Sequence, residues 1–381
     1  MAEGSADFAA LRQVVEQAVE QGIVPGAVVA CARDGATRFR EAFGARQSQP
    51  ERLPASTHTV YDIASLTKAV STSVLAMKLV AAGQISLDDH VDRYLPEFHG
   101  ELKHLVTVRH LLCHASGLPA HRPFYEQVGI GTARGNHAIP IAAAMEALIN
   151  RPGAVSVYSD LGFILLGWLL TRVTGEELDG LFRRLISDPL GLSSTTFLSI
   201  DGGDDRAFRE EFVAGHEVAP TEFCPGRGGV LLGEVHDLNA FAMGGVAGHA
   251  GLFGDAADLE RVAGALTAAW QGGVAENAIV DRDVIREFWH PAGIAGSTWR
   301  LGWDGPSSRD SQAGSRMSRA SVGHLGFTGC SLWIDPRRAL WVVLLTNRVH
   351  PVVRDDPRFR AFRAAAHDAA LDALGVRQAS D

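Results

Sequence analysis

Apolar residues recur at helical spacing at the start of the chain and at strand spacing directly after it. Residues 8–21 carry an apolar side chain at every third or fourth position and end at Gly22, which predicts an amphipathic helix. Residues 26–32 are rich in alanine and valine, and the Asp-Gly pair at 34–35 predicts a tight turn before the alternating residues 37–43. This opening segment therefore predicts one helix followed by a β-hairpin.

The end of the chain has a complementary pattern. Residues 326–335 and 341–347 are predicted strands joined by a turn at 336–338, and an arginine-rich helix is predicted over 357–374. Strands from the two ends of a chain can join one antiparallel sheet. We therefore expect an antiparallel sheet flanked by the N- and C-terminal helices.

The middle of the chain reads as helices separated by loops. The predicted helices are 65–82, 107–113, 139–149, 161–173, 176–186 and 256–271, whereas 45–57, 120–138, 199–235, 244–254 and 304–322 are predicted to lack regular structure. The fold class is therefore α+β, in a single module over 8–375. An α/β lobe spans about 8–86 and 285–375, and a mainly helical insert spans about 87–284. A cleft is expected between the lobes, with walls from 120–138, 215–254 and 296–322.

Composition narrows the possible partners. The 381 residues are 46% hydrophobic and 21% charged, with a net charge of −9 and no basic cluster interleaved with aromatic residues, so neither nucleic acid nor an anionic membrane is an expected partner. No basic segment followed by an apolar run opens the chain, so we expect a cytoplasmic protein. The four cysteines are widely spaced, which favours buried thiols over disulfides.

Ser65 and Lys68 are the first candidates for chemistry. They stand three residues apart at the start of the predicted helix 65–82, so one helical face can bring the amine to the hydroxyl. Among 35 Lys and Arg residues only Lys68, Lys78 and Lys103 are lysines. Because an arginine does not lose its proton, a general base at this position has to be lysine. The pair predicts an activated nucleophile, although a Ser-x-x-Lys tetrapeptide alone is a weak signal.

Other motif signals point to neither a metal nor a cofactor. His110 and His114 have the spacing of a metal pair with Cys113 between them, but no glutamate and no third ligand stands at motif spacing. We expect a structural role for both histidines. The glycine-dense loops match no nucleotide-binding spacing, so no cofactor is predicted.

Two further motifs accompany Ser65-x-x-Lys68 in chain order. Tyr158-Ser159-Asp160 precedes the helix 161–173, and Gly-His-Leu-Gly-Phe-Thr-Gly at 323–329 leads into a strand. With the matches at 111–119 and 245–253, the chain from about residue 8 to 351 resembles the penicillin-recognising serine hydrolases, which include class C β-lactamases, D-alanyl-D-alanine peptidases and related esterases. The resemblance implies a β-lactamase-like fold.

The resemblance also implies residue roles. Ser65 would be the nucleophile, Lys68 and Tyr158 would transfer protons, and the backbone N–H groups of Ser65 and Phe327 would form the oxyanion hole. Whether Lys68 or Tyr158 is the base stays open at this point. The substrate-binding candidates are Asp160, His324, Gly326 and His249.

Three departures from the family pattern bear on the substrate. Asp160 replaces asparagine, His324 replaces lysine and Leu325 replaces threonine, so a permanent cation and a hydroxyl that could bind a carboxylate are missing. We therefore expect a hydrolase of small ester or amide substrates acting through an acyl-Ser65 intermediate. The alternatives are a β-lactamase or D-Ala-D-Ala carboxypeptidase, and a non-catalytic ligand-binding protein on the same fold.

Overall fold

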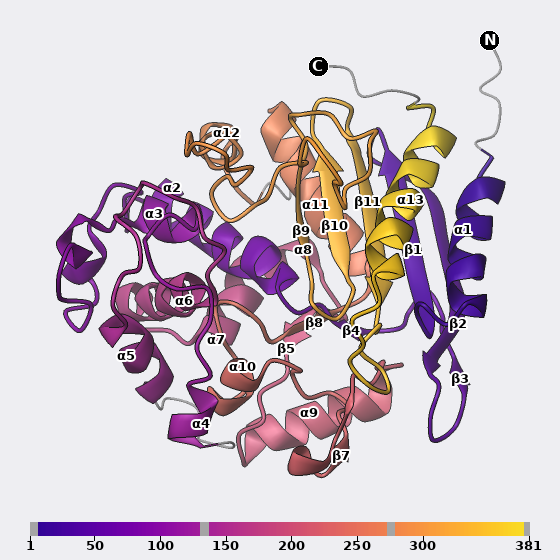
Figure 1. Cartoon of the computed structure of the whole chain (residues 1–381), viewed down its shortest axis with the longest axis horizontal. Helices are drawn as coiled ribbons and strands as arrows, with labels where there is room; N and C mark the ends of the chain where they lie inside the picture. The colour runs from indigo at the N-terminus through magenta and orange to yellow at the C-terminus, as the bar shows by residue number, and fades with distance from the viewer. Residues whose placement is uncertain (1–6, 130–136, 273–278, 377–381) are drawn as a thin grey trace.

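A computed structural model describes residues 7–129, 137–272 and 279–376 (Figure 1). The chain forms a sheet covered by helices, beside a lobe that is mostly helical. The predicted α+β class with an inserted helical lobe is confirmed. No helix within the described residues is long and apolar enough to cross a bilayer.

The main sheet joins strands from both ends of the chain. Its order is β3-β2-β1-β11-β10-β9, and every neighbouring pair is antiparallel. The central pair is β1 and β11, with Ala27 opposite Thr346. The strands are β1 (Gly26–Arg33), β2 (Ala36–Gln47), β3 (Leu53–Pro54), β9 (Val322–Leu325), β10 (Ser331–Asp335) and β11 (Leu340–Thr346).

Both faces of this sheet are buried. Because successive strand residues point to opposite faces, Val29 of β1 faces the terminal helices α1 (Ala9–Glu20) and α13 (Arg358–Ala373), whereas Val28 faces the larger core. The second face is covered by α11 (Ala256–Gln271), which packs on β1 and β11. This helix belongs to the segment predicted as the insert, although it lies on the sheet.

The helical lobe is built around α6 (Asp160–Thr174). Its residues from Leu161 to Leu170 are all buried, and the Ser159 side chain caps it by accepting from Gly162 N. The flanking helices include α3 (Val108–Leu112) and α5 (Ala138–Met145). The remaining helices are α4 (Tyr125–Val128), α7 (Leu178–Phe182), α8 (Asp188–Leu190), α9 (Asp204–Gly215), α10 (Leu238–Ala242) and α12 (Arg282–Phe288).

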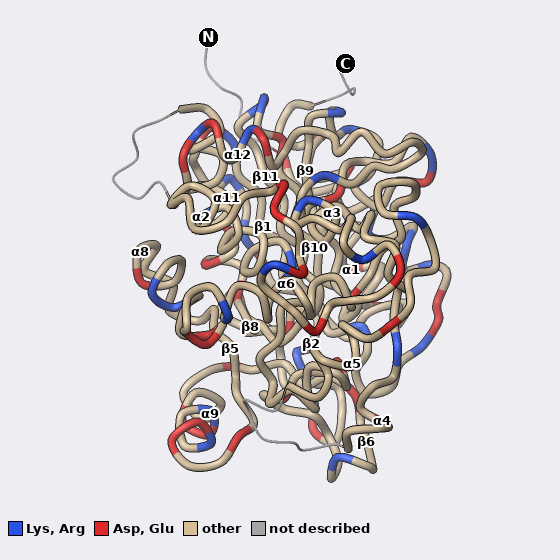
Figure 2. The backbone as a smooth tube through the Cα atoms, turned by 90° about the vertical axis from the view of Figure 1, so that its left-hand side faces the viewer, with Lys and Arg blue, Asp and Glu red and all other residues tan. Residues whose placement is uncertain are grey.

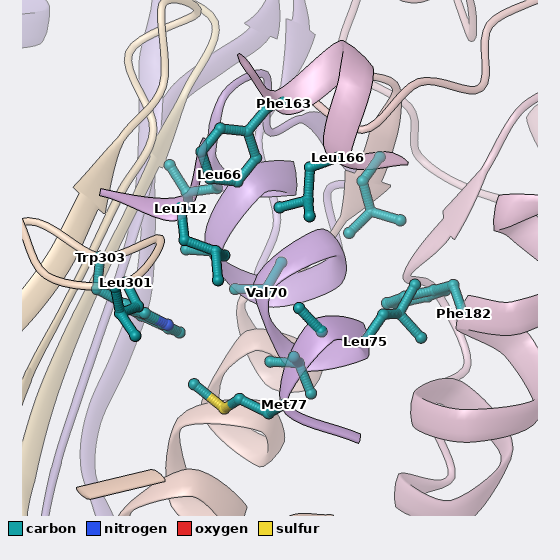
Figure 3. Close-up of a cluster of buried hydrophobic side chains, with 14 of the residues drawn as sticks. Leu66, Val70, Leu75, Met77, Leu112, Phe163, Leu166, Phe182, Leu301 and Trp303 are labelled. Carbon is teal, nitrogen blue, oxygen red and sulfur yellow. The ribbon is translucent and has the colours of Figure 1, made fainter. Parts of the chain in front are cut away.

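The helix after Ser65 starts at Leu66 and is surrounded by apolar side chains on several sides (Figure 3). It opens with a π-helical segment, η1 (Lys68–Ser73), and continues as α2 (Val74–Ala81). Leu66, Val70 and Leu75 are buried in the large core, with Phe163 from α6 and Trp303 among their neighbours in Figure 3. Residues 66–77 are all buried, and a helical segment packed on every side cannot shift its register easily, so it holds Lys68 in place.

A small second sheet fixes the approach to this helix. Its order is β4-β8-β5, formed by β4 (Tyr61–Asp62), β8 (Leu252–Gly254) and β5 (Thr196–Phe197). It places the residues just before Ser65 next to those just after the glycine-dense loop at 244–251. A two-stranded ribbon pairs β6 (Phe223–Cys224) with β7 (Gly229–Val230).

Several predictions of secondary structure need correction. The predicted loop 120–138 contains α4, and the predicted loop 244–254 contains β8. Of the strand predicted over 326–335, only residues 331–335 form a strand, β10, because the chain turns at 326–330 after a separate strand, β9. β2 continues to Gln47 in the predicted loop 45–57. The segment 199–235 contains α9, which carries both acidic and basic residues (Figure 2). The residues of α9 have good helix propensity, which favours this surface helix. The helix was not predicted because the segment around it is rich in glycine.

Candidate active site

A strained turn presents Ser65 at the start of its helix. The preceding residue, Ala64, has a φ of 49°, a left-handed conformation that is costly for a residue with a Cβ. Two hydrogen bonds hold it there: Ala64 N donates to Asp62 Oδ1 (2.8 Å), and Thr67 Oγ1 donates to Ala64 O (2.6 Å). Ser65 lines a cavity as a result.

Lys68 is fully buried and contacts three oxygens. Its Nζ lies 3.1 Å from Ser65 Oγ, 2.9 Å from the His249 carbonyl oxygen and 2.8 Å from Asp160 Oδ1. The predicted meeting of Ser65 and Lys68 is therefore present in the structure. These three acceptors match the three donors of an ammonium group.

The charge of Lys68 is set by two opposing effects. Burial lowers the pKa of the amine, but the Asp160 carboxylate and the Tyr158 hydroxyl outweigh it, so the pKa of Lys68 is raised to about 12. Burial likewise disfavours an ionised Asp160, and Lys68 together with His121 reverses this, so the pKa of Asp160 is well below its usual range. Lys68 and Asp160 are consequently an ammonium–carboxylate pair at neutral pH.

Tyr158 lies against both members of the Ser65–Lys68 pair. Its hydroxyl interacts with the side chains of Lys68 and Ser65, and its ring stacks on Trp299 with the centroids 5.4 Å apart. His114 contacts the same ring, at 4.7 Å between centroids. Burial raises the pKa of Tyr158 despite the opposing charge of Lys68, so the hydroxyl keeps its proton near neutral pH.

The turn at 326–330 brings Phe327 to the other side of the site. A Cβ at Gly326 would lie 2.7 Å from the Ile63 carbonyl oxygen, so only glycine permits this approach to the Ser65 turn. Thr328 Oγ1 donates to Asp62 O (2.7 Å), which ties the two turns together. Arg363 holds the turn from behind, since its Nη2 donates to the carbonyls of Gly329 (2.8 Å) and Gly326 (3.2 Å).

His324 of β9 lines the cavity as a neutral ring. Its Nδ1 donates to the Leu325 carbonyl (2.9 Å), so the proton is on Nδ1 and the lone pair on Nε2. Nε2 is buried and has no partner among the described residues. Burial and the charge of Lys68 lower the pKa of His324 to about 3. His324 stands where the family has a lysine, and it carries no positive charge at neutral pH.

His249 occupies a different place from the one predicted. Its side chain is buried, with Nε2 2.9 Å from Asp237 Oδ1, and it is not among the residues that line the cavity. Its backbone carbonyl, instead, accepts a hydrogen bond from Lys68. His249 therefore helps to hold Lys68 through its backbone. Its side chain does not reach the cavity, which argues against the predicted substrate-binding role.

A cavity of about 870 Å³ opens over these groups. All three predicted wall segments contribute lining residues, among them His121, His236 and Trp299; residues 130–136 of the first segment lie outside the described residues. A fourth wall, Arg348, Phe359, Arg360 and Arg363, follows β11 and was missed. One signal for it was available: Arg363 stands on the apolar stripe of α13, between Phe362 and Ala366.

The two histidines with metal-pair spacing separate in the structure. His110 completes a capping box with Thr107 at the start of α3, whereas the ring of His114 lies against Tyr158 and Trp299. Within the described ranges no group of three or more His, Cys, Asp or Glu side chains could hold a metal ion.

Comparison with known proteins agrees with this geometry. The chain matches the Beta-lactamase family over residues 11–366. It is 32% identical over 366 residues to the N-acetylmuramyl-L-alanine amidase of Bacillus subtilis (strain 168), covering 90% of this chain and 81% of the relative. It is 29% identical over 364 residues to a putative D-alanyl-D-alanine carboxypeptidase of Escherichia coli (strain K12), covering 90% and 82%.

Solved structures share the fold. EstCE1, a hydrolase with promiscuous acyltransferase activity, superposes with a TM-score of 0.73 at 22% identity, over 95% of this chain and 97% of that one. The octameric penicillin-binding protein homologue from Pyrococcus abyssi gives a TM-score of 0.72 at 23% identity, over 97% and 78%. From its sequence match and its fold, this chain belongs to the beta-lactamase family of serine hydrolases.

Proposed function

We propose that the protein hydrolyses small ester or amide substrates through an acyl-Ser65 intermediate. The observation that carries the proposal is the contact of Ser65 Oγ with Lys68 Nζ at 3.1 Å, with Tyr158 beside both and the serine open to the cavity. A hydroxyl held between a cation and a second proton-carrying group has the arrangement of an activated nucleophile.

The protonation states favour Tyr158 as the proton shuttle. Lys68 is an ammonium group and has no lone pair to accept the Ser65 proton. When Ser65 Oγ attacks the acyl carbon, the Tyr158 hydroxyl accepts the serine proton and gives its own proton to the leaving oxygen or nitrogen. Water then attacks the acyl-enzyme, and the same exchange in reverse returns a proton to Ser65. Lys68 contributes a fixed positive charge that stabilises the negative charge passing between these oxygens.

The oxyanion would be bound by the backbone N–H groups of Ser65 and Phe327. Support comes from the close approach of Gly326 to Ile63 and from Arg363, which together bring the turn at 326–330 to the Ser65 turn. Donors held in place by packing and hydrogen bonds need no reorganisation when charge develops, and one such donor is typically worth about 3 kcal/mol of barrier.

Two observations bear on the substrate class in different directions. The ring of His324, which lines the same cavity as Ser65, is neutral and supplies no cation, which favours substrates without a carboxylate next to the scissile bond. The relatives from B. subtilis and E. coli, however, are named as an amidase and a carboxypeptidase and match nine tenths of the chain. Hydrolysis of an amide in a cell-wall fragment is therefore the second candidate.

Parallel turnover measurements separate these candidates. We expect a short-chain para-nitrophenyl ester to be hydrolysed faster than a chromogenic cephalosporin, an acyl-D-Ala-D-Ala peptide or a muramyl-L-Ala fragment. Fast cleavage of either cell-wall fragment without ester turnover would favour the second candidate. Labelling by a fluorophosphonate, followed by intact mass, should add one adduct to the native chain and none to Ser65→Ala. A native chain that stays unlabelled would leave only the non-catalytic, ligand-binding alternative.

A further inference from the structure

The cavity continues past Phe327 to the wall that follows β11. Arg348, Arg360 and Arg363 all line this wall, together with Phe359, and we refer to the three side chains as the arginine wall. Aromatic rings lie under the guanidinium groups: Arg348 is 5.0 Å from the Phe327 ring centroid, and Arg363 is 4.7 Å from that of Phe359. Stacking of this kind orients a guanidinium group without neutralising it.

The positive charges of the arginine wall are not neutralised by ion pairs. In the part of the chain that the structure describes, no carboxylate lies within ion-pair distance of any of the three. Asp356 lines the same wall but is paired with Arg358 at 2.6 Å, and the exposed Asp355 acts on Arg348 only through its charge at longer range. Asp355 also lines the cavity, and other carboxylates line its remaining walls, but the three guanidinium groups outnumber the unpaired carboxylate at this wall. The positive charge is therefore local to the arginine wall.

Arg348 and Arg363 are each held by hydrogen bonds and still have an N–H donor that no described residue uses. Arg348 uses Nε for the Phe327 carbonyl (2.9 Å) and Nη1 for the Arg354 carbonyl (3.2 Å), so its second terminal nitrogen is unused by the described residues. Arg363 is only 4% exposed, and its buried Nε has no hydrogen-bond partner among the residues that the structure describes. A buried cation without a counter-charge is costly, and an anion in the cavity would offset this cost.

We propose that the arginine wall is a subsite for an anionic oxygen group, a carboxylate or a phosphate, carried by the acyl substrate at a point removed from the scissile bond. The position follows from a contrast within the cavity lining: His324 at the end of β9 is a neutral ring, whereas the arginines belong to the chain after β11, where Arg348 stacks on Phe327. This inference rests on the proposed acyl-Ser65 chemistry, because it assigns the far end of the same substrate.

Two ester series test the subsite with the full-length protein. The acyl side is probed by para-nitrophenyl butyrate against mono-para-nitrophenyl succinate. The leaving-group side is probed by phenyl acetate against its para-carboxy and para-phosphonooxy derivatives, which also distinguish a carboxylate from a phosphate. We expect KM for a charged ester in one series to be about tenfold below that of its neutral counterpart.

Arg360→Gln is the decisive variant, because Arg360 is exposed and we expect its replacement to leave the fold intact. The charged-to-neutral KM ratio should move toward one in Arg360→Gln and stay at the parent value in Arg354→Gln, which removes an exposed charge from the same segment outside the cavity lining. Equal shifts in both variants, or no preference for a charged ester in the parent, would overturn the subsite. Turnover that survives Ser65→Ala would instead overturn the acyl-Ser65 proposal.

Discussion

Two buried cations hold the two halves of the candidate site, and they are held in different ways. Lys68, on the Ser65 side, has a carboxylate at 2.8 Å, whereas the described partners of Arg363, behind the turn at 326–330, are carbonyl and amide oxygens. Burial lowers the pKa of both, yet the pKa of Lys68 ends at about 12 and that of Arg363 at about 9. A lysine needs Asp160 to stay charged in this interior, whereas a guanidinium group stays charged at neutral pH without such a partner.

The largest effect is expected from removing the paired cation. Lys68→Met should lower kcat for a nitrophenyl ester about 10³-fold or more, because it removes the charge that stabilises the proton transfer. It also removes the ammonium partner of Asp160 and leaves this carboxylate with the longer His121 contact, so the free energy of unfolding should fall. The double variant Lys68→Met/Asp160→Asn should recover that stability in thermal unfolding without recovering activity. Recovery of both would show that Lys68 serves the fold alone.

Changing the unpaired cation should have a smaller effect of a different kind. Arg363→Lys keeps a positive charge but cannot reach the carbonyls of Gly326 and Gly329 together, so the turn that carries Phe327 loosens. We expect kcat to fall about tenfold and the free energy of unfolding to fall by about 2 kcal/mol. Steady-state kinetics and urea unfolding measure the two. Unchanged kcat in a destabilised variant would separate Arg363 from the oxyanion turn.

Asp160→Asn removes the carboxylate partner of Lys68, so that Lys68, like Arg363, is a buried cation without a carboxylate beside it. Burial then opposes the ammonium form with less compensation, so the pKa of Lys68 falls. If Tyr158 is the shuttle, the fall of kcat/KM on the alkaline side should begin at a lower pH than in the parent. We also expect kcat at neutral pH to fall several-fold. A kcat/KM that instead rises with pH in this variant would identify neutral Lys68 as the base.

The smallest effect is expected at the second partner of Asp160. His121 Nδ1 lies 3.5 Å from Asp160 Oδ2, and this contact raises the pKa of the half-exposed histidine. A raised pKa stabilises the fold while the histidine is protonated, and this contribution is lost as the pH rises through the folded-state pKa. His121→Asn should therefore cost less than about 1 kcal/mol at pH 5 and almost nothing at pH 8, as measured by thermal unfolding. A larger loss at pH 8 would contradict the assigned contact.

The local pattern was enough to predict much of this molecule. Period-two and period-3.6 spacing predicted α1, the first hairpin, α6, α11 and α13, because one or both faces of each element are buried and the pattern records that burial. The turn at 326–330 was missed because its direction depends on the contact of Gly326 with Ile63 and on Arg363, which lies far away in the sequence.

The sequence by itself determined the family and the order of its motifs: Ser65 three residues before Lys68, then Tyr158, then His324. Only the tertiary structure decided their charges. Lys68 is an ammonium group because Asp160 reaches it in the interior, and His324 is neutral because it is buried near that same charge. The arginine wall likewise appears only when the connection after β11 folds against the cavity. Spacing along a chain fixes which side chains can meet locally, but a pKa depends on burial and on charges brought together from distant segments.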